Sequence, residues 1–209
     1  WWQNRGGQFR LETSDLAPAI ISDGEMAAIL EIEAVHNGRA GDHDEELATF
    51  DLLFEFAPGS PLTSAQANAV LNNLLIYLDN GDGVWTHGVD TLVLSTSTVS
   101  LVDGILSLSL ADGSPHYQLP HGSFKRYFVV ITAEGNATQQ SPNTLIMSHL
   151  TDGFDNASIS SAEDRNYDIP LGMEWTADTS SATITFFSDL IFADDFELGN
   201  LDAWDAVVP

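Results

Sequence analysis

LLIYLDNGDGVWTHGVDTLVL, residues 74–94, places an acidic, glycine-rich loop between two apolar segments. The segments 74–78 and 91–94 are rich in the β-branched, aromatic and other apolar residues that suit a half-buried strand. Asn, Asp and Gly fill the loop between them, and these residues are favoured in tight turns. The stretch therefore predicts two strands joined by the loop 79–90, and much of the chain repeats this alternation of strand and turn.

The same loop carries four side chains that offer oxygen ligands, Asp79, Asn80, Asp82 and Asp90. Calcium takes roughly six to eight oxygens from carboxylates, amides and backbone carbonyls. The loop departs from the helix–loop–helix calcium motif, because its spacing is one residue short and no Glu closes it. It resembles the looser DxNGDG turns that join strands in bacterial surface proteins. We expect a calcium site here, and a tight turn without metal is the alternative.

The chain is strongly acidic, with 31 Asp and Glu against 6 Lys and Arg and a net charge of −25. Such a charge repels phosphate backbones and anionic membranes, which argues against nucleic acid and membrane surfaces as partners. Three interpretations remain open: carboxylates that bind divalent cations, a surface adapted to high salt, or an ordinary solvated surface. The first two predict that stability depends on ions.

Cysteine is absent from the 209 residues, which excludes disulfides, zinc–thiolate sites and cysteine nucleophiles. The length fits one large domain, and no apolar run is long enough for a membrane-spanning helix. Among secreted proteins, a domain of this size without disulfides is more typical of bacteria than of eukaryotes.

Three segments show clear strand patterns. Residues 27–37 (AAILEIEAVHN) predict an inner face of Ala28, Leu30, Ile32 and Ala34, with Ile29, Glu31, Glu33 and Val35 on the wetter face. Residues 49–56 (TFDLLFEF) place Phe50, Leu52, Phe54 and Phe56 on one face, and Asp51 and Glu55 on the other. Residues 125–135 (KRYFVVITAEG) have a continuous apolar centre, which predicts a strand buried on both faces.

One helix is expected within 60–74 (SPLTSAQANAVLNNL), capped by Thr63 and Gln66 in a capping box and ended by Asn72 and Asn73. Eight or nine strands with closely spaced turns accompany it. This pattern predicts an all-β fold, an antiparallel β-sandwich of Ig-like or jelly-roll-like type. We divide the chain into an N-terminal extension (1–8), the sandwich domain (9–188) and an extended C-terminal tail (189–209).

Other polar loops hold further candidates. The loop 38–47 is interpreted first as a solvated loop, and the alternative is a shared cation held by Asp42, Asp44 and Glu46, which stand at alternate positions. Asn136 and Asn156 begin N-x-[ST] sequons in predicted loops. A third acidic group lies in the predicted loop 151–170 and consists of Asp152, Asp155, Glu163, Asp164 and Asp168.

Catalytic motifs are missing. The chain has no G-x-S-x-G, H-E-x-x-H, phosphate-binding or dinucleotide-binding motif. His43 and His87 lie in acidic loops and are interpreted as surface imidazoles, whereas His149 lies in an apolar strand as a structural residue. The sequence therefore predicts a protein that is not an enzyme.

Two resemblances bear on the setting. Residues 17–187, with DGEMAAILEIEAVHNGRAGDHDEELATFDLLF, LLIYLDNGDG and RYFVVITAEGNA, resemble uncharacterised β-sandwich repeats of large secreted or surface-displayed bacterial proteins. The tail FADDFELGNLDAWDAVVP is similar to a DGFESG-x-x-SAW element that closes many secreted proteobacterial proteins. Asp195, Phe196, Glu197, Gly199 and Trp204 carry that match, from which Asp194-Asp195 and Leu198 depart in replacing DG and Ser. The resemblance implies an extracellular or cell-surface location and brings no activity.

The leading hypothesis is a calcium-stabilised structural or adhesive module that binds other copies of itself. The tail is too apolar for a solvated linker, so it would dock on its own domain or add to a neighbour's sheet and build a filament or surface layer. Its docking residues would be Phe192, Phe196, Leu198 and Trp204. The alternative is a carbohydrate-binding module that stacks sugar rings on Trp85, Tyr117, Tyr167 or Trp175.

Overall fold

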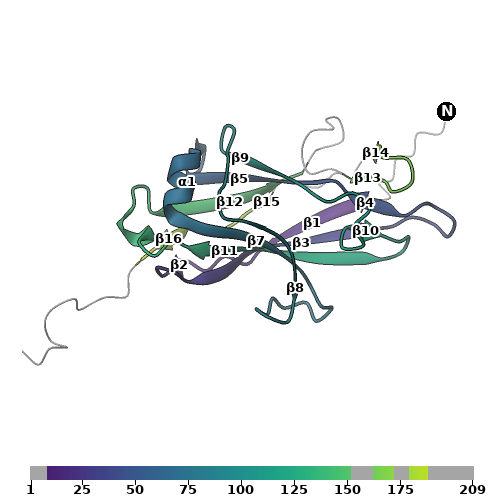
Figure 1. Ribbon diagram of the computed structural model, residues 1–209, viewed down its shortest axis with the longest axis horizontal. Helices are drawn as coiled ribbons and strands as arrows, with labels where there is room; N and C mark the ends of the chain where they lie inside the picture. Colours follow the sequence, from purple (N-terminus) through teal and green to yellow (C-terminus); the bar gives the residue numbers. More distant parts are fainter. Residues whose placement is uncertain (1–8, 152–161, 172–178, 188–209) are drawn as a thin grey trace, which may run out of the picture.

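The computed structural model describes residues 9–151, 162–171 and 179–187, and shows two β-sheets packed face to face with a smaller sheet at one end (Figure 1). The first layer has the order β1 (Phe9–Asp15), β3 (Met26–His36), β11 (Phe124–Ala133), β7 (Leu71–Leu78) and β8 (Thr91–Thr96). Every neighbouring pair in this layer is antiparallel.

The second layer follows the order β2 (Ile20–Ile21), β16 (Ile184–Phe186), β12 (Thr144–Leu150), β5 (Thr49–Ala57) and β6 (Ser60–Pro61). Two further strands join it, β9 (Ile105–Ser109) on β5 and β15 (Thr179–Ser180) on β12. The pairing of β16 with β2 is parallel, whereas the others in this layer are antiparallel. The expected all-β sandwich is confirmed, with this short parallel pair as an addition.

The third sheet, called the end sheet below, has the order β10 (Gln118–Leu119), β4 (Glu45–Leu47), β13 (Ala162–Asp164) and β14 (Ile169–Leu171). It lies at the right end of the sandwich in Figure 1. The segments 38–47 and 151–170 had been expected to be loops, and short strands within both are a correction. These strands form because residues distant in sequence pair with one another, as Glu46 does with Glu163.

The core between the two layers is built from the alternating residues of facing strands. Phe50, Leu52 and Phe54 are fully buried, and the Phe50 ring meets that of Tyr127 edge-on at 5.4 Å. Phe56, expected on the same face, is 36% exposed because β5 runs out of the core at this end. Asp51, expected on the solvated face, is buried, and its carboxylate accepts a hydrogen bond from Ser107 Oγ.

Strand β3 contains a shift in the face that it buries. The pairing with β11 passes from Leu30↔Val129 to Ala28↔Val130, so Ile29 is an extra residue in a β-bulge. Ile29 is therefore fully buried in the main core, while Ala28 packs on the outer cluster. The sequence pattern alone predicts the opposite face for each of these two residues.

Helix α1 (Ser64–Val70) begins with the expected capping box between Thr63 and Gln66. It ends earlier than expected, since Leu71 is already extended (φ −115°, ψ 121°) and begins β7. Asn72 and Asn73 thus belong to a strand. Pairing of β7 with β11 begins at Leu71↔Ala133, and the backbone hydrogen bonds gained there outweigh the helical tendency of the segment. A short 3₁₀-helix, η1 (Ala137–Gln139), follows β11.

The loop 79–90 folds beneath the first layer and covers part of its outer face (Figure 1). Leu75, Tyr77, Phe128 and Val130 form a second apolar cluster there, with Trp85 of the loop packed against it. Residues 127–130 of β11 are consequently buried on both faces, as expected from the sequence. No helix in the described ranges combines the length and apolarity needed to cross a bilayer.

Candidate cation-binding site

The hairpin β7–β8 determines where the acidic side chains of its loop lie. Leu78 pairs with Thr91, so the residues just beyond this pair, Asp79 and Asp90, stand at the base of the loop. The backbone then turns at Gly81 and Gly83, where φ is +108° and +77°, in the region that favours glycine. Asp82 lies between these glycines. As a result, Asp79, Asp82 and Asp90 each offer a carboxylate oxygen within 4.8 Å of the others.

Backbone amides hold these carboxylates in place. Asp79 Oδ1 accepts hydrogen bonds from Gly81 N at 3.0 Å and Gly83 N at 3.2 Å. Asp90 is 6% exposed, and its oxygens accept from Asn80 N at 3.0 Å and Thr86 N at 2.7 Å. Asp82, the exposed member, accepts only from Val84 N, at 3.0 Å.

Asn80, the fourth expected ligand, uses its side-chain oxygen within the loop. Its Oδ1 accepts a hydrogen bond from Asp82 N at 3.0 Å. The amide thus shapes the turn on which Asp82 stands, and a ligand role for Asn80 remains a prediction.

Arg126 of β11 links this loop to the outer face of the sheet. Its guanidinium lies 3.3 Å from Asp79 Oδ2 and 2.9 Å from an oxygen of both Glu31 and Glu33. The Nε–Glu31 contact is an ion pair without hydrogen-bond geometry. Burial works against the charge of Arg126, but the three carboxylates outweigh it and raise the pKa of the guanidinium. Glu31 and Glu33, interpreted from sequence as solvated, are therefore members of an ion-pair network.

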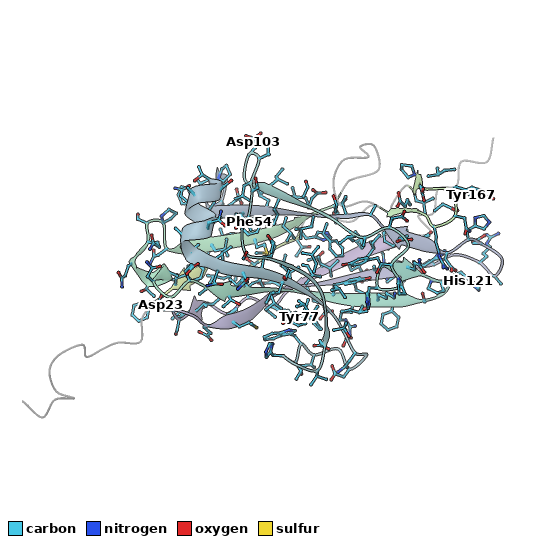
Figure 2. The ribbon with its side chains drawn as sticks, in the orientation of Figure 1. Asp23, Phe54, Tyr77, Asp103, His121 and Tyr167 are labelled. Atoms are coloured by element: carbon cyan, nitrogen blue, oxygen red, sulfur yellow. The ribbon has the colours of Figure 1, made fainter. Side chains whose placement is uncertain are left out.

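Aromatic side chains attach the loop to the apolar outer cluster. The Trp85 ring lies 6.1 Å from that of Tyr77 at 64°, and the Tyr77 hydroxyl is 3.4 Å from His87 Nδ1. Tyr77 points from the first layer toward the loop in Figure 2. The carboxylates and the aromatic side chains that cover the sheet therefore belong to one loop.

The second expected group is not brought together. Asp42, Asp44 and Glu46 do not form one of the converging acidic groups among the described residues. Asp44 pairs with Arg165 at 2.8 Å, Asp42 Oδ2 accepts from Arg39 N at 2.5 Å, and Glu46 is buried in β4. The formation of β4 separates them, because a strand directs Glu46 toward the sheet face and leaves the two aspartates in the preceding turn.

Glu45, the neighbour of Glu46, is buried beside His36. Gly38 N donates to His36 Nδ1 at 2.9 Å, and His36 Nε2 donates to the His43 carbonyl at 3.0 Å. Because Nδ1 is thus an acceptor, the imidazole is neutral and does not neutralise Glu45, whose Oε1 lies 3.5 Å away. Burial, followed by the charges of Asp42 and Asp164, raises the pKa of Glu45 to about 8.

The residues expected to stack sugars or carry glycans differ in how exposed they are. Tyr117 is 3% exposed and donates its hydroxyl to the Val93 carbonyl, so its ring cannot serve as a sugar platform. Tyr167 is 66% exposed, and Figure 2 shows it at the far end of the molecule. Asn136 is exposed, while the hydroxyl of its sequon partner Thr138 donates to Asp23. Several expected residues lie outside the described ranges: Asn156, Trp175, Phe192, Phe196, Leu198 and Trp204.

The histidines lie as the sequence suggested. His43 is partly exposed and lies 3.0 Å from Asp164. His149 is fully buried, and its Nδ1 is 2.6 Å from Thr13 Oγ1. Its predicted position in an apolar strand is confirmed.

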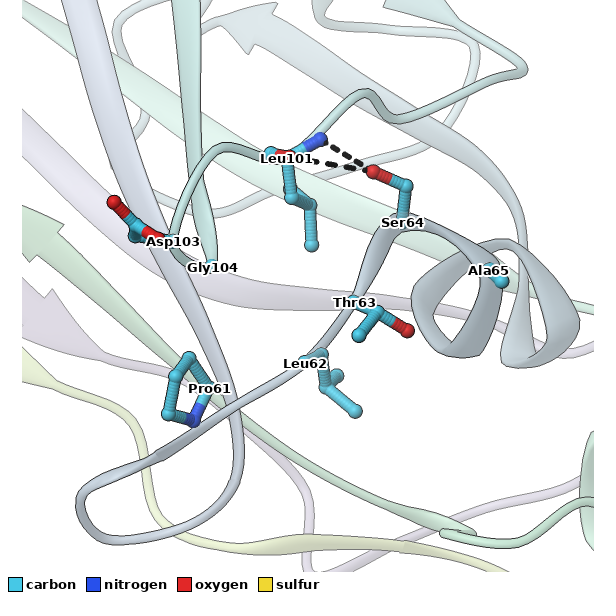
Figure 3. Close-up of a pocket in the computed structure, with 8 residues that line it drawn as sticks. All are labelled: Pro61, Leu62, Thr63, Ser64, Ala65, Leu101, Asp103 and Gly104. Atoms are coloured by element: carbon cyan, nitrogen blue, oxygen red, sulfur yellow. Dashed lines mark hydrogen bonds between the residues drawn. The ribbon is translucent and has the colours of Figure 1, made fainter.

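A surface hollow of about 480 Å³ lies beside α1 and is lined by residues 61–65 with Leu101, Asp103 and Gly104 (Figure 3). Ser64 Oγ accepts a hydrogen bond from Leu101 N at 2.8 Å, which joins the helix start to the opposite wall. Asp103 is the one titratable residue in this lining. The hollow therefore presents no pair of carboxylates facing each other.

No family model matches the chain, and no curated protein sequence matches it. Among solved structures, it is similar to a cohesin module from a Clostridium perfringens family 33 glycoside hydrolase, with 13% identity and a TM-score of 0.33. That match covers 88% of this chain and 99% of the cohesin chain.

Proposed function

We propose that this chain is a calcium-stabilised, non-enzymatic structural module of an extracellular or cell-surface protein. The observation that carries the proposal is the convergence of Asp79, Asp82 and Asp90 in a loop that also packs Trp85 on the sheet. The resemblance of the sequence to secreted and surface-displayed bacterial repeats supports the location.

The physical reason for calcium is charge. Three carboxylates within 4.8 Å of one another repel, and Arg126 contacts only Asp79 of the three. Calcium lies about 2.3–2.6 Å from its ligands, so oxygens up to about 5 Å apart fit around a single ion. A bound ion would remove the repulsion and hold the loop against the apolar outer cluster that contains Tyr77 and Phe128.

Calcium is expected to raise the melting temperature, and Asp82→Asn is expected to reduce that rise. The variant keeps an oxygen to accept from Val84 N but loses the charge. A ligand that binds only the folded state stabilises it by about 2.7 kcal/mol at a hundredfold excess over Kd. Calorimetric melting in calcium and in chelator measures the difference.

Asp103→Asn is the matched control, because Asp103 is an exposed turn residue (φ 52°) that lies outside the group of Asp79, Asp82 and Asp90. Its calcium response should equal that of the wild type. Sodium chloride at matched ionic strength separates screening from binding. Equal stabilisation by sodium chloride and calcium, with Asp82→Asn indistinguishable from wild type, would remove this site.

Self-assembly through the tail belongs to the same proposal and rests on sequence alone. Deletion of residues 189–209 is expected to convert oligomers into stable monomers, because apolar residues such as Phe196 and Trp204 would no longer reach a neighbouring sheet edge. Light scattering and thermal melting measure both effects. A wild-type monomer whose truncation only lowers the melting temperature would mean that the tail docks on its own domain.

Carbohydrate binding is the second candidate, favoured by one observation. Tyr167 presents an exposed ring, with the His43 ring at 5.4 Å and the Asp164 carboxylate beside it. Exposed rings with adjacent polar groups suit sugar stacking. Binding of a soluble polysaccharide that Tyr167→Ala abolishes would favour this candidate over a purely structural module.

A further inference from the structure

A second group of acidic side chains converges on the end sheet. Asp112, Glu163 and Asp168 each place a carboxylate oxygen within 4.8 Å of the others. They come from separate segments: the turn after β9, strand β13 and the turn before β14. None of them belongs to the loop 79–90, so the group is independent of the site described above.

A buried carboxylate with one oxygen that makes no hydrogen bond lies behind this group. Glu46 of β4 is 1% exposed, and its Oε1 has no hydrogen-bond partner. Glu46 and Glu163 are direct antiparallel partners. Directly opposed residues project from the same sheet face with their Cβ atoms about 5 Å apart, so Glu46 points toward the converging oxygens. A buried carboxylate oxygen without a hydrogen bond is costly, which indicates that a ligand for this oxygen is missing.

The surrounding charges agree. Asp168, Asp112 and Glu46 all lie close enough to Glu163 to act on its charge. The cation that acts on Glu46 is Lys125. Burial lowers the pKa of the Lys125 ammonium, and the negative charge of Glu46 acts in the opposite direction. The Lys125 ammonium donates a hydrogen bond to the Pro115 carbonyl. This ammonium therefore acts on Glu46, behind the three converging carboxylates.

We infer that Asp112, Glu163 and Asp168 form a second calcium site, with Glu46 as a buried charge behind it. All four groups offer carboxylate oxygens, the ligands that calcium prefers over softer metals. The separations of up to 4.8 Å among the oxygens of Asp112, Glu163 and Asp168 suit the calcium–oxygen distance of about 2.3–2.6 Å.

The site would act as a staple for the end sheet. Its strands are only two or three residues long, and strands so short have few backbone hydrogen bonds of their own. An ion that joins the turn after β9 to β13 and to the turn before β14 would tie three segments together. The inference thus goes beyond the proposed function, because it assigns ion-dependent stability to a second part of the molecule.

The test is calcium stoichiometry on the full chain, by titration calorimetry and native mass spectrometry with calcium chloride. The wild type is expected to bind two ions, Asp82→Asn one, and the double variant Asp112→Asn/Asp168→Asn one. Asn suits both positions, because it favours turns and tolerates the positive φ of 51° at residue 168. Combining all three substitutions should abolish binding.

Glu46→Gln supplies a separate readout. It keeps the volume of the side chain and removes the buried charge, so calcium affinity at the end sheet should fall about tenfold, as for loss of a group that supports metal ligands. Glu12→Gln is the matched control, on an exposed residue of β1, and should leave both affinities unchanged.

Two results would overturn the inference. One is an unchanged stoichiometry and affinity in Asp112→Asn/Asp168→Asn when its circular dichroism matches the wild type. The other is complete loss of bound calcium in Asp82→Asn alone. Conversely, a single ion that Asp82→Asn leaves in place and Asp112→Asn weakens would support this site while removing the site in the loop 79–90.

Discussion

Glu45→Gln is expected to stabilise the protein by about 3 kcal/mol at pH 8 and to leave its stability unchanged at pH 4.5. Glu45 is 4% exposed, its Oε2 has no hydrogen-bond partner, and the neighbouring His36 is neutral. Asp42 and Asp164 add negative potential. The ionised carboxylate is therefore disfavoured in the folded state and costs nothing in the unfolded chain.

The sign of the pH dependence follows from proton binding. The pKa of Glu45 rises from 4.5 to about 8 on folding, so between these values the native state holds a proton that the unfolded state has lost. The stability contributed by this group is complete below pH 4.5 and is lost as the pH rises to 8. At about 1.4 kcal/mol per unit, the full loss approaches 5 kcal/mol, and Gln removes most of it.

His149 produces the opposite pH dependence, a loss of stability on the acid side. Burial lowers its pKa from 6.5 to about 3, so its contribution is present above pH 6.5 and is lost as the pH falls toward 3. Between pH 4.5 and 6.5 the two slopes oppose each other. The wild type should show a plateau there, with stability falling on both sides.

Denaturant unfolding from pH 4 to 8.5, in chelator, measures both losses of stability. In Glu45→Gln, the fall in unfolding free energy at alkaline pH should become smaller, while the fall at acid pH should persist. Glu12→Gln serves again as the exposed control and should reproduce the wild-type profile. An equal gain from Glu45→Gln at pH 4.5 and pH 8 would show that improved packing, and not ionisation, causes the stabilisation.

The sequence predicts the fold class well because alternation directly reports which residues share a strand face. The pattern of 49–56 anticipates the buried Phe50, Leu52 and Phe54, and the continuous apolar centre of 125–135 anticipates burial on both faces. The position of Ile29 was not predictable in this way, since a β-bulge depends on the register with β11 and not on the local pattern.

The two candidate sites differ in the same way: one depends on local sequence and the other on strand pairing. The loop 79–90 is local, so its carboxylates are adjacent in sequence, and three of the four named residues converge. The group on the end sheet joins residues 112, 163 and 168 through the pairing of two strands expected to be loops. Acidic residues in short polar segments indicate a solvated loop, and only the tertiary pairing buries Glu45 and Glu46.

The ion-pair network of Arg126 is also not predicted from the sequence, although one signal for it is present. A lone arginine lies in the apolar strand 124–133, while Glu31 and Glu33 alternate on another. In the structure, Arg126↔Glu33 are directly opposed, and Asp79 approaches from the loop. Recognising the network requires knowing that β3 and β11 are neighbours.

Arg126→Met is expected to destabilise the protein by about 3 kcal/mol in chelator, because it leaves three carboxylates without their shared cation. The Asp79 side chain is 3% exposed and those of Glu31 and Glu33 are 21% and 25% exposed, so solvent screens the remaining repulsion poorly. Met keeps an apolar stem of similar length over the sheet. Denaturant unfolding in chelator measures the loss.

Arg165→Met is the matched control for charge removal. Arg165 contacts a single carboxylate, Asp44, and the two side chains are 42% and 30% exposed. Exposed pairs of this kind contribute less than about 1 kcal/mol. Equal losses in the two variants would mean that the network around Arg126 is worth no more than an ordinary surface pair.

Calcium gives Arg126→Met a second, opposite readout. In the wild type the guanidinium contacts Asp79 Oδ2, so a cation in the loop shares this carboxylate with Arg126. Without the arginine, the local charge is more negative and calcium should bind more tightly, by Coulomb attraction. The destabilisation measured in chelator should therefore shrink in calcium, and this gain should disappear in Arg126→Met/Asp82→Asn. A destabilisation that calcium leaves unchanged would mean that the network and the loop carboxylates act independently.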